Sequence, residues 1–174
     1  MGVTTMSKLV ALLSHVPGAI FSEGVSEEEI IHAEEELGLR FPDDYRQYLK
    51  EFGTVSFYHP HRTHMMFDAE WTGVNTEQKY RDVVITTLEE RKRYPDFPHN
   101  AFVIENMGVP GMSVICDTEG NVSLMMMGVA RWTVDICKYA QTCQERGQRF
   151  ESFMRESEEC QSKLAEVITS EHIC

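Results

Sequence analysis

Three histidines and an aspartate in one short stretch are the densest group of side chains that could bind a metal ion. His59, His61 and His64 lie close together, and Asp68 follows them. Imidazole nitrogens and carboxylate oxygens are common zinc ligands. Because no cysteine pair and no HExxH helix accompanies them, the spacing favours a polar loop over a metal site, with a small metalloenzyme as the alternative.

The cysteines offer little support for nucleophilic or redox chemistry. The chain has five of them, an odd number that forms no simple disulfide framework, so we expect reduced thiols. Cys116 lies in an apolar strand pattern, where buried and unreactive thiols are common. Cys137 and Cys143 have the spacing of neither a redox CxxC pair nor a zinc knuckle. We therefore assign these thiols no role.

Two acids near the ends of neighbouring predicted strands, Glu105 and Asp117, could form the carboxylate pair that glycosidases use. Two unrelated surface acids are the favoured interpretation. The sequence contains no P-loop, no GxGxxG, no GxSxG elbow and no set of kinase motifs. The motifs of phosphate binding and of standard acyl transfer are therefore absent.

Large apolar residues could instead contact a partner protein. Trp71 and Trp132 could anchor an interface, although packing in the core explains them equally well. The run Met125, Met126 and Met127 could line a groove, but alternate residues of a strand more often fill the core, which is the favoured interpretation.

The formal net charge of −12 bears on the kind of partner. Phosphate affinity comes from Lys and Arg, so this charge argues against direct binding of nucleic acid. The acid excess is greatest in residues 1–60, which contain ten acidic and four basic residues. We expect a partner with a basic surface, and the alternative is that the charge only keeps the protein soluble.

The composition, with 42% hydrophobic and 25% charged residues, is that of a globular protein, and 174 residues suffice for one domain. No stretch approaches the roughly 20 consecutive apolar residues of a membrane helix. Residues 1–16 lack the pattern of a signal peptide. We therefore expect a single domain over residues 1–174, in the cytoplasm and without membrane contact.

Two capped helices are the clearest predicted elements. Ser26 and Glu29 can form a capping box at the start of the first, and Gly38 suits its end. Pro42 suits the first position of the second helix, which Gly53 can close. Apolar residues recur at helical spacing in both, and we expect these acids to point largely outward: Glu27, Glu28, Glu34 and Glu35 in the first helix. Two further acids, Asp43 and Asp44, follow Pro42.

The rest of the chain predicts an α+β fold. An earlier helix is expected at residues 6–16, a short strand from residue 54, and a helical segment ending before Pro95, with Val83, Val84 and Leu88 inward. Residues 101–106, 112–118 and 121–127 are strand-like, the last two joined as a hairpin. Residues 131–144 fit either a strand or a helix start, and a helix is expected near the C-terminus. We expect a mainly antiparallel sheet with helices on one face.

The stretch GVSEEEIIHAEEELGLRFPDDYRQYLKEFG, residues 24–53, resembles the signature of the SUKH superfamily, which includes the Smi/Knr-type domains. The matching features are a helix with acidic residues, a Leu-Gly step at residues 37–38, a Pro-Asp helix start at residues 42–43 and the closing Gly53. FVIEN at 102–106, ICDT at 115–118 and RFESFMRE at 149–156 extend the resemblance over a core of about residues 20–160.

The resemblance implies an α+β fold without catalytic residues or a cofactor. In bacteria the family's typical role is that of an immunity protein, which binds and neutralises a polymorphic or contact-dependent toxin, often a nuclease. Eukaryotic relatives act as regulatory or scaffold modules, which is the alternative. From charge alone, the residues expected to contact a basic toxin are Glu27, Glu28, Glu34, Glu35, Asp43 and Asp44.

Overall fold

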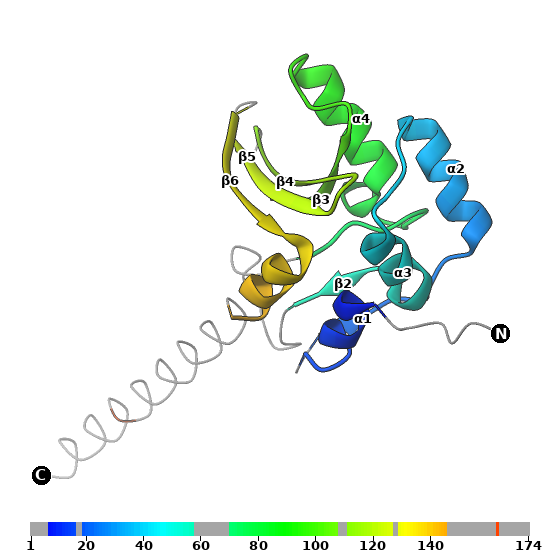
Figure 1. The fold of residues 1–174 in the computed structure, drawn as a ribbon, viewed down its shortest axis with the longest axis vertical. Helices are drawn as coiled ribbons and strands as arrows, with labels where there is room; N and C mark the ends of the chain where they lie inside the picture. The colour runs from blue at the N-terminus through cyan, green and yellow to red at the C-terminus, as the bar shows by residue number, and fades with distance from the viewer. Residues whose placement is uncertain are drawn as a thin grey trace, which may run out of the picture.

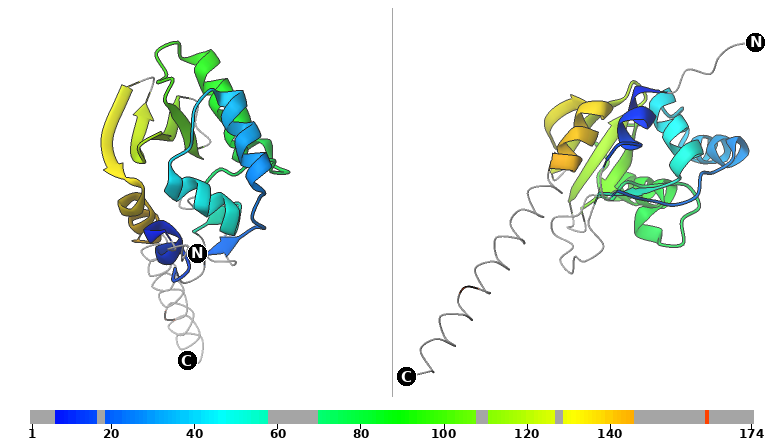
Figure 2. Two further views of the ribbon diagram at one scale, coloured as in Figure 1. Left: turned by 45° about the vertical axis from the view of Figure 1, so that its right-hand side comes forward. Right: turned by 90° about the horizontal axis from the view of Figure 1, so that it is seen from below.

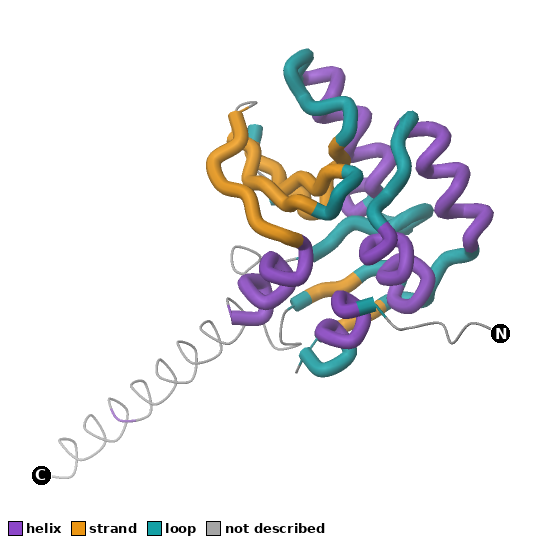
Figure 3. The backbone as a smooth tube through the Cα atoms, in the orientation of Figure 1, coloured by secondary structure: helices purple, strands orange, loops and turns teal. Residues whose placement is uncertain are grey.

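The computed structural model describes residues 7–16, 19–57, 70–107, 111–126, 129–145 and 163. Its helices lie mostly in the first half of the chain and its main sheet in the second (Figures 1 and 3). The chain order is α1 (Lys8–Leu13), β1 (Ile20–Phe21), α2 (Glu27–Leu37), α3 (Asp43–Phe52), β2 (Val55–Ser56), the 3-10 turn η2 (Lys79–Arg81), α4 (Val83–Arg93), β3 (Ala101–Asn106), β4 (Met112–Asp117), β5 (Asn121–Met126) and β6 (Val129–Asp135). Residues 136–145 are again helical.

The main sheet is antiparallel, with the strand order β3-β4-β5-β6, and a separate two-stranded sheet joins β1 to β2. The predicted α+β class and the hairpin around Gly120 are confirmed. Residues 131–144, for which a strand and the start of a helix are the two alternatives, contain both: β6 runs to Asp135 and a helix follows. Helices α2, α3 and α4 lie to one side of the curved sheet (Figures 1 and 2).

Helix α2 begins and ends where the sequence predicts, and α3 begins one residue later than expected. The Ser26 hydroxyl accepts from the Glu29 backbone N–H while the Glu29 carboxylate accepts from the Ser26 N–H, which is a complete capping box. Gly38 closes α2 in the left-handed conformation, at φ 66°. Pro42 is the N-cap of α3 and not its first helical residue, because its ψ of 149° is extended.

The inner face of α4 differs from the prediction. Val83 is fully buried, but Leu88 is 44% exposed, and Thr86 and Thr87 are buried in its place. The spacing explains the error, because Thr86 and Thr87 lie three and four residues after Val83, on the same helical face, whereas Leu88 lies five after it. The Thr87 hydroxyl accepts a hydrogen bond from the backbone N–H of Val103 in β3, at 2.9 Å.

Aromatic side chains join α3 to the sheet. Phe41, Tyr45, Tyr48, Trp71 and Phe102 are at most 1% exposed, and their rings contact one another at centroid distances of 4.7–5.4 Å. Trp71 is therefore a core residue and not an interface anchor. Burial raises the pKa of both tyrosine hydroxyls above the ordinary range.

Thr72 is the polar centre of this core. Its carbonyl oxygen accepts hydrogen bonds from the hydroxyls of Tyr45 and Tyr48, each at 3.1 Å. Its own hydroxyl donates to the carbonyl of Val103, and its N–H donates to the carbonyl of Ile104, each at 2.8 Å. One residue therefore links helix α3 to the outer edge of strand β3.

Several predicted features lie outside the described residues: His59, His61, His64, Asp68, Met127 and the C-terminal helix, of which only Lys163 is described. Within the described ranges, no group of three His, Cys, Asp or Glu side chains could hold a metal ion. No helix in the described part of the chain is long and apolar enough to span a membrane.

Gly53 should tolerate substitution poorly, because it combines a positive φ with a close approach of other backbone. It closes α3 at φ 70°, and a Cβ built there would lie 2.0 Å from the backbone oxygen of Glu23. We expect Gly53→Ala to lower the free energy of unfolding by about 3 kcal/mol or more, from left-handed strain and the clash together.

The matched control is Gly38→Ala. Gly38 has a similar φ of 66°, but a Cβ built there meets nothing within 4 Å, so only the strain of about 1 kcal/mol should appear. Urea denaturation of both variants measures the difference. Equal losses would show that the close approach at Gly53 does not matter.

Candidate protein-interaction site

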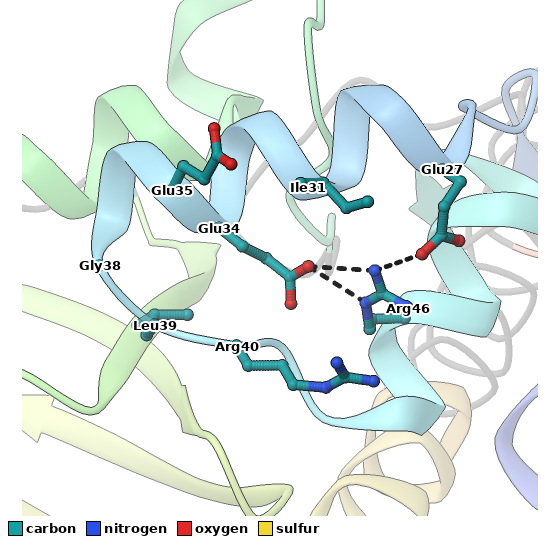
Figure 4. A pocket seen from close by; sticks show the side chains of 8 residues that line it. All are labelled: Glu27, Ile31, Glu34, Glu35, Gly38, Leu39, Arg40 and Arg46. Carbon is teal, nitrogen blue, oxygen red and sulfur yellow. Dashed lines mark hydrogen bonds and ion pairs between the residues drawn. The ribbon is translucent and has the colours of Figure 1, made fainter.

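An open pocket of about 660 Å³ lies between α2, the connection that follows it and the start of α3 (Figure 4). Three of the six predicted contact acids line it, together with cationic and apolar residues that the sequence did not single out. The lining residues are Glu27, Ile31, Glu34, Glu35, Gly38, Leu39, Arg40 and Arg46.

The Glu34 carboxylate lies at the inner wall of this pocket. Its Oε1 accepts from Nε and Nη2 of Arg46, at 3.2 and 3.1 Å, and its Oε2 accepts from the backbone N–H of Phe41, at 2.7 Å. The Glu34 and Arg46 side chains are only 10% and 11% exposed. The outward orientation predicted for Glu34 is therefore wrong, and its carboxylate instead ties α2 to α3.

Glu27 extends this network toward solvent. Its carboxylate is paired with Lys50 and with Nη2 of Arg46, and hydrogen bonds to these two cations lower the pKa of Glu27 below the ordinary value of 4.5. Burial acts to lower the pKa of Arg46, but its hydrogen bonds to Glu27 and Glu34 outweigh this and raise it. Arg46 is therefore a fixed cation held by two carboxylates.

The outer part of the pocket combines apolar surface with free charge. Ile31 is 42% exposed and Leu39 is half-buried, while the neighbouring Glu35 is exposed. Figure 4 shows Ile31 and Leu39 on either side of the Glu34–Arg46 pair. Apolar contact area beside a carboxylate suits a basic side chain, which carries an aliphatic stem and a cationic end.

The remaining predicted contacts lie outside the pocket lining. Glu28 and Asp43 are exposed, and Asp44 is half-buried at the start of α3. Asp43 reaches the pocket rim indirectly, because its carboxylate lies 3.7 Å from the guanidinium of Arg40. The structure therefore brings Glu27, Glu34 and Glu35 together, and places the other three beside them.

The proposed carboxylate pair of Glu105 and Asp117 does not form. In the register of β3 and β4, Glu105 is opposite Val114 while Asp117 is opposite Ala101. Glu105 is buried, at 3% exposure, and accepts a hydrogen bond from the Tyr139 hydroxyl, so it is not a surface acid either. The Asp117 carboxylate accepts from the backbone N–H groups of Glu119 and Asn121 and so fixes the β4–β5 turn.

The cysteine thiols have the buried character expected of core residues. Cys116 is fully buried, and burial raises the pKa of its thiol well above the ordinary range. Cys137 and Cys143 are also buried. A thiol that resists ionisation is a poor nucleophile, which fits a packing role for Cys116.

A comparison with protein-family models identifies the fold family. The SUKH_5 model, described as SMI1-KNR4 cell-wall, matches residues 6–156. The chain belongs to this SUKH family. The match covers α1 to β6, and it confirms the resemblance of residues 24–53 to the superfamily signature. No curated protein sequence matches the chain.

Family membership supports a SUKH-type protein-interaction domain, and SUKH domains are generally non-enzymatic binding or immunity domains. The pocket fits this class, because its lining offers carboxylates, guanidinium groups and apolar contact area. The structure also explains two family positions in physical terms. Gly38 ends α2 and Pro42 begins α3, so together they fix the turn that forms one wall of the pocket.

The buried ion pair should be the most stability-sensitive part of the pocket. We expect Glu34→Ala to lower the free energy of unfolding by about 3 kcal/mol, because Arg46 and the Phe41 N–H both lose a buried acceptor. Glu35→Ala, at an exposed position one residue later, should cost less than about 0.5 kcal/mol. Chemical denaturation of the two variants compares them directly, and similar losses would contradict the structural role of Glu34.

Stability should fall in acid because of carboxylates at the start of α2. The pKa of Glu29 is lowered, first by its hydrogen bond from the Ser26 N–H and then by Asn75 and the Ser26 hydroxyl. The pKa of Glu27 is lowered as well. Because the pKa values of these two carboxyls are lower in the folded protein than in the unfolded chain, their ionised forms stabilise the fold above pH 4.5. This stabilisation is lost as the pH falls through the folded-state pKa values.

The measurement is the melting temperature between pH 7 and pH 3. The double variant Glu27→Gln/Glu29→Gln should melt lower than the natural protein at pH 7 and lose less on acidification. Glu28→Gln/Glu35→Gln, which removes two exposed acids of the same helix, serves as the control and should follow the natural curve. A double variant at 27 and 29 that also follows that curve would refute this linkage.

Proposed function

We propose that this SUKH protein is a cytoplasmic immunity protein that neutralises a cognate bacterial toxin by direct one-to-one binding. Family membership supports the protein-binding part of this proposal. The observation that carries the rest is the pocket between α2 and α3, where the exposed Ile31 and the half-buried Leu39 lie within the most acidic third of the chain. Such a surface suits a basic partner, and many toxins neutralised by this superfamily are nucleases.

In this proposal the exposed acids and the apolar side chains have different tasks. Glu28, Glu35, Asp43 and Asp44 create the negative potential that speeds encounter with a basic surface. Ile31 and Leu39 provide area that loses water on binding, which fixes the position of the partner. Glu34 and Arg46 keep α2 and α3 at a constant spacing and need not touch the toxin.

Neutralisation by this route needs no chemistry from the immunity protein. An acidic surface that covers the phosphate-binding face of a nuclease excludes its nucleic-acid substrate, because both ligands compete for the same cations. In the proposed function the protein is therefore not an enzyme and uses no cofactor. The alternative, a regulatory or scaffold module, would use the same surface on a host protein.

The direct test is co-expression with the toxin genes that neighbour this gene. We expect this protein to restore growth of cells that produce the cognate toxin and to form a one-to-one complex with it in solution. Continued killing with every neighbouring toxin would overturn the immunity role, and a genomic neighbourhood without toxin genes would favour the regulatory module.

Charge reversal in the pocket region should weaken the complex. We expect Glu28→Lys/Glu35→Lys to reduce affinity by at least about tenfold, mainly through slower association and most strongly at low salt. Surface plasmon resonance at two salt concentrations measures this. Asp96→Lys/Glu119→Lys makes the same charge change at exposed acids that lie in neither α2 nor α3 and should have a much smaller effect.

A further inference from the structure

One wall of the pocket between α2 and α3 is formed by residues 38–40, which connect the two helices (Figure 4). This 38–40 wall lies between Leu37, the last residue of α2, and Phe41. Its Phe41 end is fixed, because the Phe41 N–H donates to the Glu34 carboxylate at 2.7 Å. The place of the wall in the pocket therefore depends on how its Leu37 end is held.

The Leu37 end is held by an arginine of another helix. Nη1 of Arg91, in α4, donates to the Leu37 carbonyl at 2.8 Å, and Nη2 of the same guanidinium donates to the His99 carbonyl at 3.2 Å. His99 lies in the connection from α4 to β3. One side chain therefore ties the end of α2 to α4 and to the segment that leads into the sheet.

Helix α4 is itself bonded to the sheet. The Thr87 hydroxyl accepts from the Val103 N–H of β3 at 2.9 Å. Thr87 precedes Arg91 by four residues, so both side chains leave the same face of the helix. Helices α2 and α4 lie side by side (Figures 1 and 2). The face of α4 that is bonded to β3 is therefore also bonded to the end of α2.

The end of α2 needs a donor from another segment. The last carbonyls of a helix have no partner within the helix, and the negative end of its dipole attracts a cation. The last turn of α2 contains no basic residue of its own. The N–H groups of Gly38 and Leu39 bond to carbonyls one turn earlier, and the Arg91 guanidinium supplies both a donor to Leu37 and a positive charge.

The burial of Arg91 is unfavourable in itself. Its Nε is buried and has no hydrogen-bond partner among the described residues, and burial lowers the pKa of the guanidinium. A buried donor without an acceptor opposes folding. Burial alone therefore does not account for an arginine at this position, whereas the two carbonyls that it holds do.

We propose that Arg91 is a positioning residue for the pocket, because its guanidinium holds the end of α2 and so keeps Leu39 where a bound protein meets it. This inference rests on the proposed function, in which Leu39 loses water on binding. Arg91 does not line the pocket and acts through the 38–40 wall. Since a wall that is already fixed loses little freedom on binding, removal of Arg91 should mainly speed dissociation.

Amide hydrogen exchange of the full chain tests the positioning step without a toxin. Arg91→Met keeps an unbranched stem and lacks both donors. In this variant the amides of Gly38, Leu39 and Phe41, which are hydrogen-bonded in the natural protein, should exchange at least about tenfold faster, because the wall opens locally.

Two controls separate local opening from a general loss of stability. The amides of Glu29 and Ile30, bonded to Ser26 at the other end of α2, should exchange as in the natural protein. Arg93→Met is the matched variant, because Arg93 is an exposed arginine of the same helix, and it should leave exchange at the wall unchanged.

The second measurement is the dissociation rate of the cognate toxin that co-expression identifies. Arg91→Met should raise this rate by about tenfold and leave association nearly unchanged. In a Leu39→Ala background the same substitution should have a much smaller effect, because the side chain that Arg91 positions is then absent. A full effect in that background would show that Arg91 does not act through Leu39 and would overturn the proposal.

Arg91→Gln, which also removes the charge and the long reach, keeps the test valid if Arg91→Met fails to fold. Unchanged exchange at the wall in the folded variants, or equal acceleration at both ends of α2, would overturn the positioning role. Faster exchange at the wall with unchanged toxin dissociation would overturn its link to binding. If no neighbouring toxin binds the natural protein, the proposed function fails, and the exchange data still decide whether Arg91 holds the wall.

Discussion

Thr72 is the residue through which the helical and the sheet parts of this protein are held together. The hydroxyls of two α3 tyrosines hydrogen-bond to it, and its own N–H and hydroxyl donate to the backbone of β3. Because Thr72 is 1% exposed, an unmade bond here would leave a polar group without water or a partner. The aromatic rings packed around it require this alignment, and the position of α3 against the sheet depends on it.

The binding pocket depends in turn on that fixed α3. Arg46 follows the buried Tyr45 on α3, so the packing of Tyr45 in the core fixes where the Arg46 guanidinium meets α2. Glu34 meets it from the inner stripe of α2 and also holds the Phe41 N–H. The most acidic region of the sequence therefore contains both structural acids and free ones, and only the free ones can contribute to a partner's affinity without weakening the fold.

Local signals predicted much of this architecture. The capping box at Ser26 and Glu29, the left-handed Gly38 and the strands at 101–106, 112–117 and 121–126 depend on neighbouring residues, so the sequence contains the information directly. The outward orientation expected of Glu34 is wrong although its spacing is informative: Glu34 lies four residues after Ile30 and three before Leu37, on the buried stripe of α2. Its burial depends on Arg46, twelve residues away, and no local pattern reports that pairing.

The pocket and the closure of the β3 edge could not be predicted from the sequence for the same reason. The apolar pattern predicts Leu88 as a core residue, yet Leu88 is exposed, and the buried Thr87 accepts the hydrogen bond from the Val103 N–H of β3. Whether a strand edge is closed is decided by segments distant in sequence, here residues 72 and 87. The Thr72 and Thr87 side chains that close β3 lie 31 and 16 residues from Val103, so the sequence of residues 101–106 alone does not show which backbone groups of this strand are satisfied.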